Sequence, residues 1–197
     1  MYICHARKKI FVHIQKTGGT AIRRSVLSRM PEGEQFLRYH NYKHGWLGLL
    51  SGIYEDYSAF TVVRNPYQRF VSLFLYTKKG PPGNPLTEAA LNGDLYNFMM
   101  FLDSQKDEMG NKIIFSQYDF IKHDFIKTEF YKYEDGLQNA ADSISDSLGL
   151  DRAVLEKNEH TNYYGDYNYL DYLDDKAVKL MNNLLCDTFE TFGYEML

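Results

Sequence analysis

The chain has 197 residues, of which 44% are hydrophobic and 24% are charged, and this is ordinary for a globular protein. We therefore expect a single domain, spanning residues 1–197, with a substantial core. No apolar run approaches the roughly 20 residues needed to cross a bilayer, and the first residues do not resemble a signal peptide. Cys4 and Cys186 have no metal or redox spacing, so we interpret them as free thiols in the cytoplasm.

Charge is distributed unevenly along the chain. Residues 1–79 hold 13 Lys and Arg against 4 Asp and Glu, whereas residues 80–197 hold 9 against 22. This asymmetry predicts that the N-terminal part meets an anion and that the remainder is a solvated acidic surface. No long basic run or DNA-reading motif is present, so we expect no nucleic-acid partner.

The first predicted unit is a strand, a glycine turn and a helix. Residues 10–14 (IFVHI) have strand character, Gln15 follows, and a helix is expected from Ala21 onward, through AIRRSVLSRM. The turn between them consists of Lys16, Thr17, Gly18, Gly19 and Thr20. Unpaired N–H groups of the first helical turn, the helix dipole, two glycines and a lysine together form a typical anion site. Because Lys16 precedes the glycines, the pattern is not a Walker A motif, and an ordinary strand-to-helix turn is the alternative.

The elements up to residue 85 continue the alternation. In chain order they are a short strand at 36–39, a loop at 40–45, a short helix at 46–54, a strand at 59–63, a helix at 67–78 and a loop at 80–85. The strand at 59–63 is continuously apolar, as in a buried parallel sheet. After it, Asn65 is expected to cap the next helix and Pro66 to occupy its first position.

The remaining elements give the fold class. They are a helix near 87–103, an ambiguous stretch at 111–121, a strand at 129–133, a helix at 137–148, a tyrosine-rich stretch at 163–172 and a last helix at 175–189. Strands that alternate with helices predict an α/β fold with a mainly parallel central sheet flanked by helices on both faces. Ligands of such sheets bind beyond the carboxyl ends of the strands, where both the glycine turn and Arg64 are expected.

A second anion cluster follows the strand at 59–63. Arg64 offers a planar fork suited to phosphate, and Ser72, two helical turns later, could add a hydroxyl. For Arg69 the expected role is different, namely an ion pair with an acidic neighbour. Two anion clusters at neighbouring strand ends suggest one ligand with two phosphate-like groups.

At this point the sequence resembles the sulfotransferases that use 3′-phosphoadenosine 5′-phosphosulfate (PAPS). It is most similar to the branch of bacterial enzymes and carbohydrate O-sulfotransferases related to heparan sulfate 2-O-sulfotransferase. FVHIQKTGGT is similar to the family's 5′-phosphosulfate loop and VVRNPYQRFVSLF to its 3′-phosphate segment. Weaker matches are KHGW at 43–46, YKYEDGLQ at 131–138, HTN at 160–162 and DTFETFGYE at 187–195.

The resemblance implies a fold, a donor and site residues. It implies a P-loop-kinase-like sulfotransferase domain in which PAPS is the donor, PAP the product, and no metal is required. The 5′-phosphosulfate would be held by Lys16, Thr17, Gly18, Gly19 and Thr20. The 3′-phosphate would be held by Arg64 and Ser72. Two departures are Gln15, where the family usually has proline, and a chain that is short for this branch.

Sulfuryl transfer needs aligned oxygens, a charge on the leaving group that is neutralised, and a base for the acceptor hydroxyl. We expect Lys16 to neutralise the leaving group. Histidine has a suitable unperturbed pKa of about 6.5, and His13 lies in an expected buried strand, where a structural role is expected. The family pattern places the catalytic histidine at His44, with His40 as the second candidate.

The expected reaction is in-line transfer of a sulfuryl group from PAPS to a hydroxyl of an acceptor, such as a saccharide or another small or lipid alcohol. Two alternatives stay open: a P-loop-like nucleotide kinase, and a non-catalytic relative that binds anions or glycans. Two roles stay open for residues 163–172: stacking on the ligand and packing in the core. The acceptor's identity and the oligomeric state do not follow from the sequence.

Overall fold

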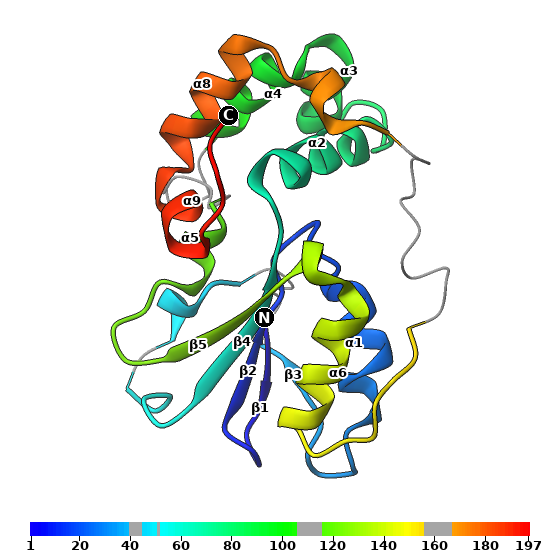
Figure 1. The fold of residues 1–197 in the computed structure, drawn as a ribbon, viewed down its shortest axis with the longest axis vertical. Helices are drawn as coiled ribbons and strands as arrows, with labels where there is room; N and C mark the ends of the chain where they lie inside the picture. Colours follow the sequence, from blue (N-terminus) through cyan, green and yellow to red (C-terminus); the bar gives the residue numbers. More distant parts are fainter. Residues whose placement is uncertain (40–44, 51, 106–115, 156–166) are drawn as a thin grey trace. The chain divides into compact units, whose positions relative to one another are not determined.

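The computed structural model describes residues 1–39, 45–50, 52–105, 116–155 and 167–197, and these fold into two compact units (Figure 1). Unit 1 is built from Met1–Arg64 and Gln117–Thr161, and unit 2 from Asn65–Ser116 and Asn162–Leu197. The expectation of a single domain over the whole chain stays a prediction.

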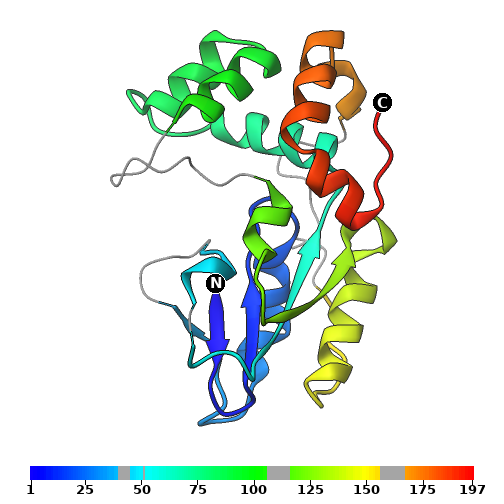
Figure 2. The same ribbon diagram turned by 90° about the vertical axis from the view of Figure 1, so that its left-hand side faces the viewer.

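A five-stranded sheet forms the centre of the described part of unit 1. Its strands are β1 (Tyr2–Cys4), β2 (Lys9–Val12), β3 (Leu37–Arg38), β4 (Ser58–Val63) and β5 (Lys127–Lys132). The order across the sheet is β3-β1-β2-β4-β5. Strands β2, β4 and β5 are parallel, which confirms the parallel centre expected from the sequence. Figure 2 shows these strands side by side, with β5 at the edge opposite the chain's N-terminus.

The antiparallel edge of the sheet was not expected from the sequence. Strand β1 pairs antiparallel with both β2 and β3, and the turn between β1 and β2 is formed by residues 5–8. Lys8 adopts a φ of 51° in this turn, where glycine or asparagine would be the usual signal. The hairpin therefore has no turn signature that sequence reading could find. Strand β3 confirms the short strand expected at 36–39.

Helices cover the sheet of unit 1. They are α1 (Gly19–Ser25), η1 (Leu27–Arg29), η2 (Leu47–Leu49), α5 (Gln117–Ile121), η3 (Tyr133–Asp135) and α6 (Leu137–Ser147). Figure 1 shows α1 and α6 on the same face of the sheet, and Phe11, Phe60, Ile22 and Ile144 share one buried cluster there. Residues such as Ile10 alternate with Phe11 and are buried on the opposite face, as a sheet covered on both sides requires.

Two helices of unit 1 are shorter than expected. The helix that was expected to run from Ala21 to Met30 ends at Ser25 and continues as the 3₁₀ turn η1. The described residues in the range 46–54 form only the 3₁₀ turn η2, because Gly48 and Gly52 weaken a helix and Gly52 adopts a φ of 47°. Within the ambiguous stretch at 111–121, the described residues form α5.

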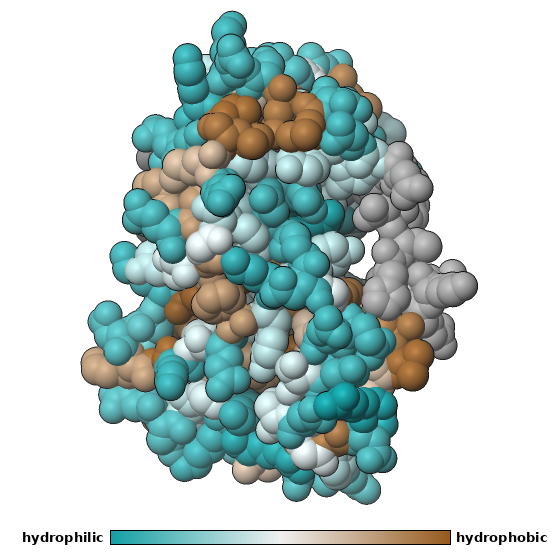
Figure 3. Space-filling model, viewed as in Figure 1, coloured by the Kyte–Doolittle hydropathy of each residue, from teal (hydrophilic) through white to brown (hydrophobic). Residues whose placement is uncertain are grey.

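The described part of unit 2 is helical. Its elements are α2 (Pro66–Thr77), α3 (Pro85–Asn92), α4 (Leu95–Ser104), η4 (Tyr169–Tyr172), α8 (Asp175–Leu184) and α9 (Cys186–Phe192). Phe70, Phe98, Met181 and Phe189 from four of these helices are fully buried in one cluster. Figure 3 shows apolar side chains gathered on part of this unit's surface.

The start of α2 confirms its expected cap. The Asn65 side chain accepts hydrogen bonds from the backbone N–H groups of Tyr67 and Gln68, and Pro66 occupies the first helical position. The stop and start signals therefore fix where β4 ends and α2 begins. Arg64 is consequently held between a strand and a capped helix.

The single helices expected at 87–103 and 175–189 were wrong. The first is divided at Gly93, after which Asp94 caps α4 by accepting from the N–H of Asn97 at 2.8 Å. The second is divided at Leu185, whose φ of −120° and ψ of 16° are not helical. None of the helices in the described ranges is long and apolar enough to cross a membrane.

Candidate functional site

Three parallel strands of unit 1 bring their carboxyl ends to one edge of the sheet. Val12 at the end of β2 pairs with Thr61 of β4, and Val63 at the end of β4 pairs with Lys132 of β5. The residues that follow these strands therefore emerge at the same edge. They are His13, the glycine loop at 14–20, Arg64 and Tyr133.

The glycine loop is folded tightly by its own residues. Lys16 and Gly18 adopt positive φ angles of 66° and 84°, and Gly18 is the left-handed N-cap of α1. The Thr17 hydroxyl donates to the carbonyl of Ile14 at 3.0 Å, and the N–H of Ala21 donates to the carbonyl of Gly18 at 2.9 Å. These bonds turn the chain from β2 into α1 and explain why glycine and threonine occupy the loop.

Neither glycine of the loop has room for a side chain. A Cβ atom on Gly18 would lie 2.8 Å from a methyl carbon of Leu137 and 3.3 Å from the Tyr133 ring. A Cβ atom on Gly19 would lie 2.3 Å from Cδ2 of His13. The loop is thus packed against α6 at Gly18 and against His13, the residue after β2, at Gly19.

Lys16 is a partly buried cation with an altered proton affinity. Burial lowers its pKa, and the positive charge of Arg64 lowers it further, to about 8. Both effects disfavour the charged form of the amine. A bound anion would offset them, because its negative charge stabilises the ammonium. A lysine whose pKa is shifted by burial and by a neighbouring charge is typical of functional sites.

Arg64 lies beside the loop. Its Nη1 donates to the backbone carbonyl of Lys16 at 3.4 Å, and its Cζ lies 4.5 Å from the centroid of the Tyr133 ring. The residue is only 8% exposed. Lys16 and Arg64, which were expected at one site from their positions after two strands, are therefore brought together. Two cations held this close create a strong positive potential at the sheet edge.

Gln117 fixes the backbone of Arg64, and no sequence motif predicted this role. Its side-chain Oε1 accepts from the N–H of Arg64 at 2.9 Å, and its Nε2 donates to the carbonyl of Arg64 at 2.6 Å. Gln117 is 1% exposed, so both bonds are shielded from water. The partners are 53 residues apart, and no local pattern connects them. Tyr133 was likewise noticed only as part of a weaker motif.

Gln117→Glu should destabilise the fold by about 1–3 kcal/mol, because a second acceptor would face the Arg64 carbonyl in place of a donor. The midpoint of thermal unfolding measures this loss. Gln35→Glu is the matched control: Gln35 is exposed and accepts from the N–H of Gly33, a role that glutamate keeps. Equal midpoints for the two variants would contradict a positioning role for the Gln117 amide.

The other expected ligand of the 3′-phosphate, Ser72, lies on α2 in unit 2, as does Arg69. Ser72 is 6% exposed and Arg69 is 2% exposed. Burial lowers the pKa of Arg69 to about 9. Because Ser72 and Arg64 belong to different units, their assignment to one site stays a prediction.

His40 and His44, the candidate bases, lie outside the described residues, as do His160 and residues 163–166 of the tyrosine-rich stretch. In the described remainder of that stretch, Tyr167, Tyr169 and Tyr172 pack against the apolar cluster of unit 2. Of the described histidines, His123 has a structural role: its Nε2 bonds the Leu50 carbonyl, and its Nδ1 accepts from the N–H groups of Phe125 and Ile126. His5 lies in the β1–β2 turn, away from the carboxyl ends of the strands, and bonds the Tyr57 hydroxyl at 3.0 Å. Neither is placed to serve the loop.

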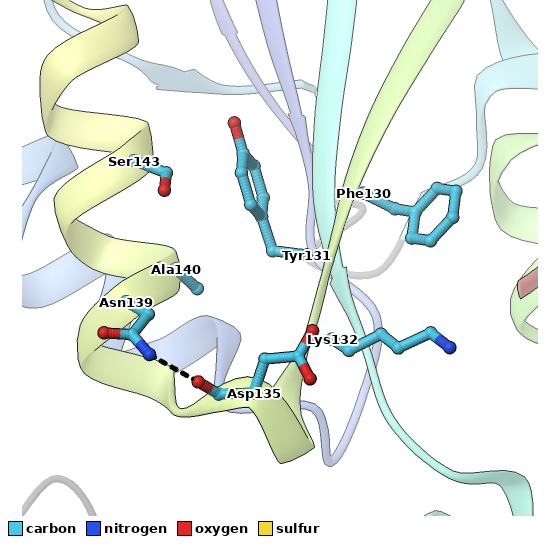
Figure 4. A pocket seen from close by; sticks show the side chains of 7 residues that line it. All are labelled: Phe130, Tyr131, Lys132, Asp135, Asn139, Ala140 and Ser143. Carbon is cyan, nitrogen blue, oxygen red and sulfur yellow. Dashed lines mark hydrogen bonds between the residues drawn. The ribbon is translucent and has the colours of Figure 1, made fainter.

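A pocket of about 270 Å³ lies between β5 and α6 (Figure 4). In this view Tyr131 and Asn139 line it from the two sides, and Phe130 points away from α6. The pocket follows the strand that leads to Tyr133, but its lining includes neither Lys16 nor Arg64. Within the described residues, no group of three or more His, Cys, Asp or Glu side chains could hold a metal ion.

Comparisons with known proteins identify the family and the fold. The family model described as the sulfotransferase family matches residues 1–195. Among solved structures, the chain is similar to the crystal structure of mouse sulfotransferase SULT7A1 complexed with PAP. That match has a TM-score of 0.57 and 14% sequence identity, and covers 95% of this chain and 86% of the mouse chain. No match was found among curated proteins. The fold is therefore the α/β fold of a sulfotransferase, and the chain belongs to the sulfotransferase family.

Proposed function

We propose that the protein transfers the sulfuryl group of PAPS to a hydroxyl of an acceptor by in-line displacement, releasing PAP. The observation that carries this proposal is the contact of Arg64 with the backbone of Lys16, at the carboxyl edge of a parallel sheet, in a member of the sulfotransferase family. The mouse structure with the similar fold is a complex with PAP, which supports the choice of donor.

The glycine loop would hold the 5′-phosphosulfate. Backbone N–H groups from Thr17 to Thr20 would contact its oxygens as fixed dipoles, which need no reorganisation during the reaction. The Lys16 ammonium would neutralise the charge that develops on the bridging oxygen as the S–O bond to the nucleotide breaks. The acceptor oxygen would form the new S–O bond on the opposite side of sulfur.

Arg64 and Ser72 would hold the 3′-phosphate. The guanidinium of Arg64 can offer two parallel N–H donors to a phosphate, and the Ser72 hydroxyl can offer a third. Tyr133 supports the planar guanidinium from one side. Selectivity for a 3′-phosphorylated nucleotide over one without that phosphate would follow.

His44 is our candidate for the base that removes the proton of the acceptor hydroxyl, and His40 is the second candidate. His44→Ala should lower kcat by roughly 10²–10⁴-fold, because general-base catalysis contributes about that much. The dissociation constant of PAP should change little, since the base contacts the acceptor and not the nucleotide. His40→Ala is the matched variant, and full activity of His44→Ala alongside an inactive His40→Ala would reverse the assignment.

The acceptor class proposed is a saccharide or another small or lipid alcohol. The acidic charge of the C-terminal part disfavours a strongly anionic glycan as acceptor. The proposal requires no metal. A cytoplasmic location stays a prediction from the sequence.

Two measurements test the proposal. PAP should raise the midpoint of thermal unfolding without Mg²⁺, because a ligand that binds only the folded state stabilises it by about 2.7 kcal/mol at 100 times its dissociation constant. PAP should also form from PAPS when a panel of hydroxyl acceptors is supplied. Mg²⁺-dependent stabilisation by ATP with none by PAP would favour a nucleotide kinase. Stabilisation by PAP without turnover of any acceptor would favour a non-catalytic binding protein.

A further inference from the structure

The ring of His13 lies directly beneath the glycine loop. His13 follows β2 and is 3% exposed. The ideal Cβ position on Gly19 lies 2.3 Å from Cδ2 and 2.8 Å from Nε2 of the imidazole. A carbon atom at that position would overlap the ring, so the backbone of Gly19 packs directly against the imidazole.

The imidazole is held from the other side by the sheet. Its ring stacks on Phe11 at 5.8 Å between centroids with an angle of 18° between planes. Phe11 is fully buried and stacks in turn on Tyr2 at 6.3 Å. His13 and Phe11 are two residues apart along an extended chain, which places them on one face. A ring packed in this way cannot move aside cheaply.

A side chain is excluded at the two glycines of the loop for different reasons. Gly18 has a φ of 84° and faces Leu137, so both its backbone conformation and its surroundings oppose a side chain. Gly19 has no positive φ and opens α1, where alanine would be an acceptable residue. At Gly19 the three atoms nearest to the Cβ position all belong to the His13 ring.

We propose that His13 is a positioning residue for the glycine loop. The stack of Tyr2, Phe11 and His13 sets the height of Gly19 above the sheet, and thereby the direction in which the loop presents its N–H groups and Lys16. The inference rests on the proposed function, because the consequence of this positioning is affinity for the 5′-phosphate. It assigns His13 a role in binding that it performs through the loop, without contact to the nucleotide.

A double-mutant cycle tests this role. His13→Ala and Gly19→Ala should each weaken PAP binding by about tenfold or more, as measured by calorimetry, because the loop either sinks or is pushed outward. In His13→Ala/Gly19→Ala the new methyl group occupies space left by the ring. The PAP affinity of the double variant should therefore fall by less than the product of the two single-variant losses.

Gly18→Ala is the matched control. Combined with His13→Ala it should show independent losses, because its obstacle is Leu137 and its own φ. Should His13→Ala fail to fold, His13→Asn, which also removes the ring but keeps a polar side chain, replaces it in the cycle.

Each outcome decides the inference. Losses that multiply independently in the His13–Gly19 pair, or a His13 variant that has a lower unfolding midpoint but binds PAP as the wild type does, would overturn it and leave the proposed function intact. Wild-type protein that does not bind PAP would overturn the proposed function, and the inference with it.

Discussion

Lys16→Ala should reduce kcat/KM for PAPS by roughly 10²–10³-fold and weaken PAP binding as well. The size follows from the loss of one charged donor at the leaving oxygen, a contact that is strongest in the transition state. Initial rates of sulfuryl transfer and calorimetric titration with PAP measure the two effects. Lys8→Ala is the control, because Lys8 is an exposed lysine that pairs with Asp56 and should leave both quantities unchanged. Retention of near wild-type transfer by Lys16→Ala would remove this lysine from the mechanism.

The pKa of Lys16, about 8, adds a pH dependence to PAP affinity. Below that pH the amine is charged and ready for an anion, whereas above it a proton must be taken up before binding. The phosphates of PAP are already ionised in this range, since their second pKa is about 6. The dissociation constant of PAP should therefore rise as pH increases above about 8, and should rise much less in Lys16→Ala.

Arg64→Ala should strongly reduce the preference of the protein for PAP over adenosine 5′-phosphate. A charge-assisted hydrogen bond contributes about 1.5–3 kcal/mol, so PAP affinity should fall by roughly 10–150-fold. Affinity for adenosine 5′-phosphate should fall less. Because both ligands are measured on the same variant, partial unfolding cannot mimic a change in their ratio.

Two further variants sharpen the prediction for Arg64. Arg64→Lys should restore only part of the preference, because an ammonium lacks the planar fork of a guanidinium. Arg152→Ala is the control, since Arg152 is exposed and pairs with Asp146. Arg64→Ala should also move the pH dependence of PAP binding upward, because the charge that lowers the pKa of Lys16 is gone. An unchanged ratio of the two affinities in Arg64→Ala would exclude a contact with the 3′-phosphate.

Local signals in the sequence identified the centre of the site. An apolar run predicted β4, Asn65 and Pro66 predicted the start of α2, and a strand followed by Gly18 and Gly19 predicted the loop before α1. Each signal involves residues close together in the chain. The shared edge of Lys16 and Arg64 then followed from the rule that parallel strands carry ligands at their carboxyl ends.

What could not be predicted depends on distant or unmarked residues. Gln117 recognises the backbone of Arg64 across the sequence, and His13 limits Gly19 through ring packing that no motif encodes. The break at Leu185 has no glycine or proline to mark it, whereas Gly93 followed by Asp94 did carry a stop and start signal. The roles of Ser72 and His44 stay predictions.

We propose that two anion sites at adjoining strand ends together bind one adenosine bisphosphate. Calorimetric titration of the wild-type protein with PAP, adenosine 5′-phosphate and adenosine 3′-phosphate tests it directly. The account predicts one PAP per chain, bound at least about 100-fold more tightly than either monophosphate, because linked contacts act together at high effective concentration. PAP that binds no better than adenosine 5′-phosphate would contradict the account.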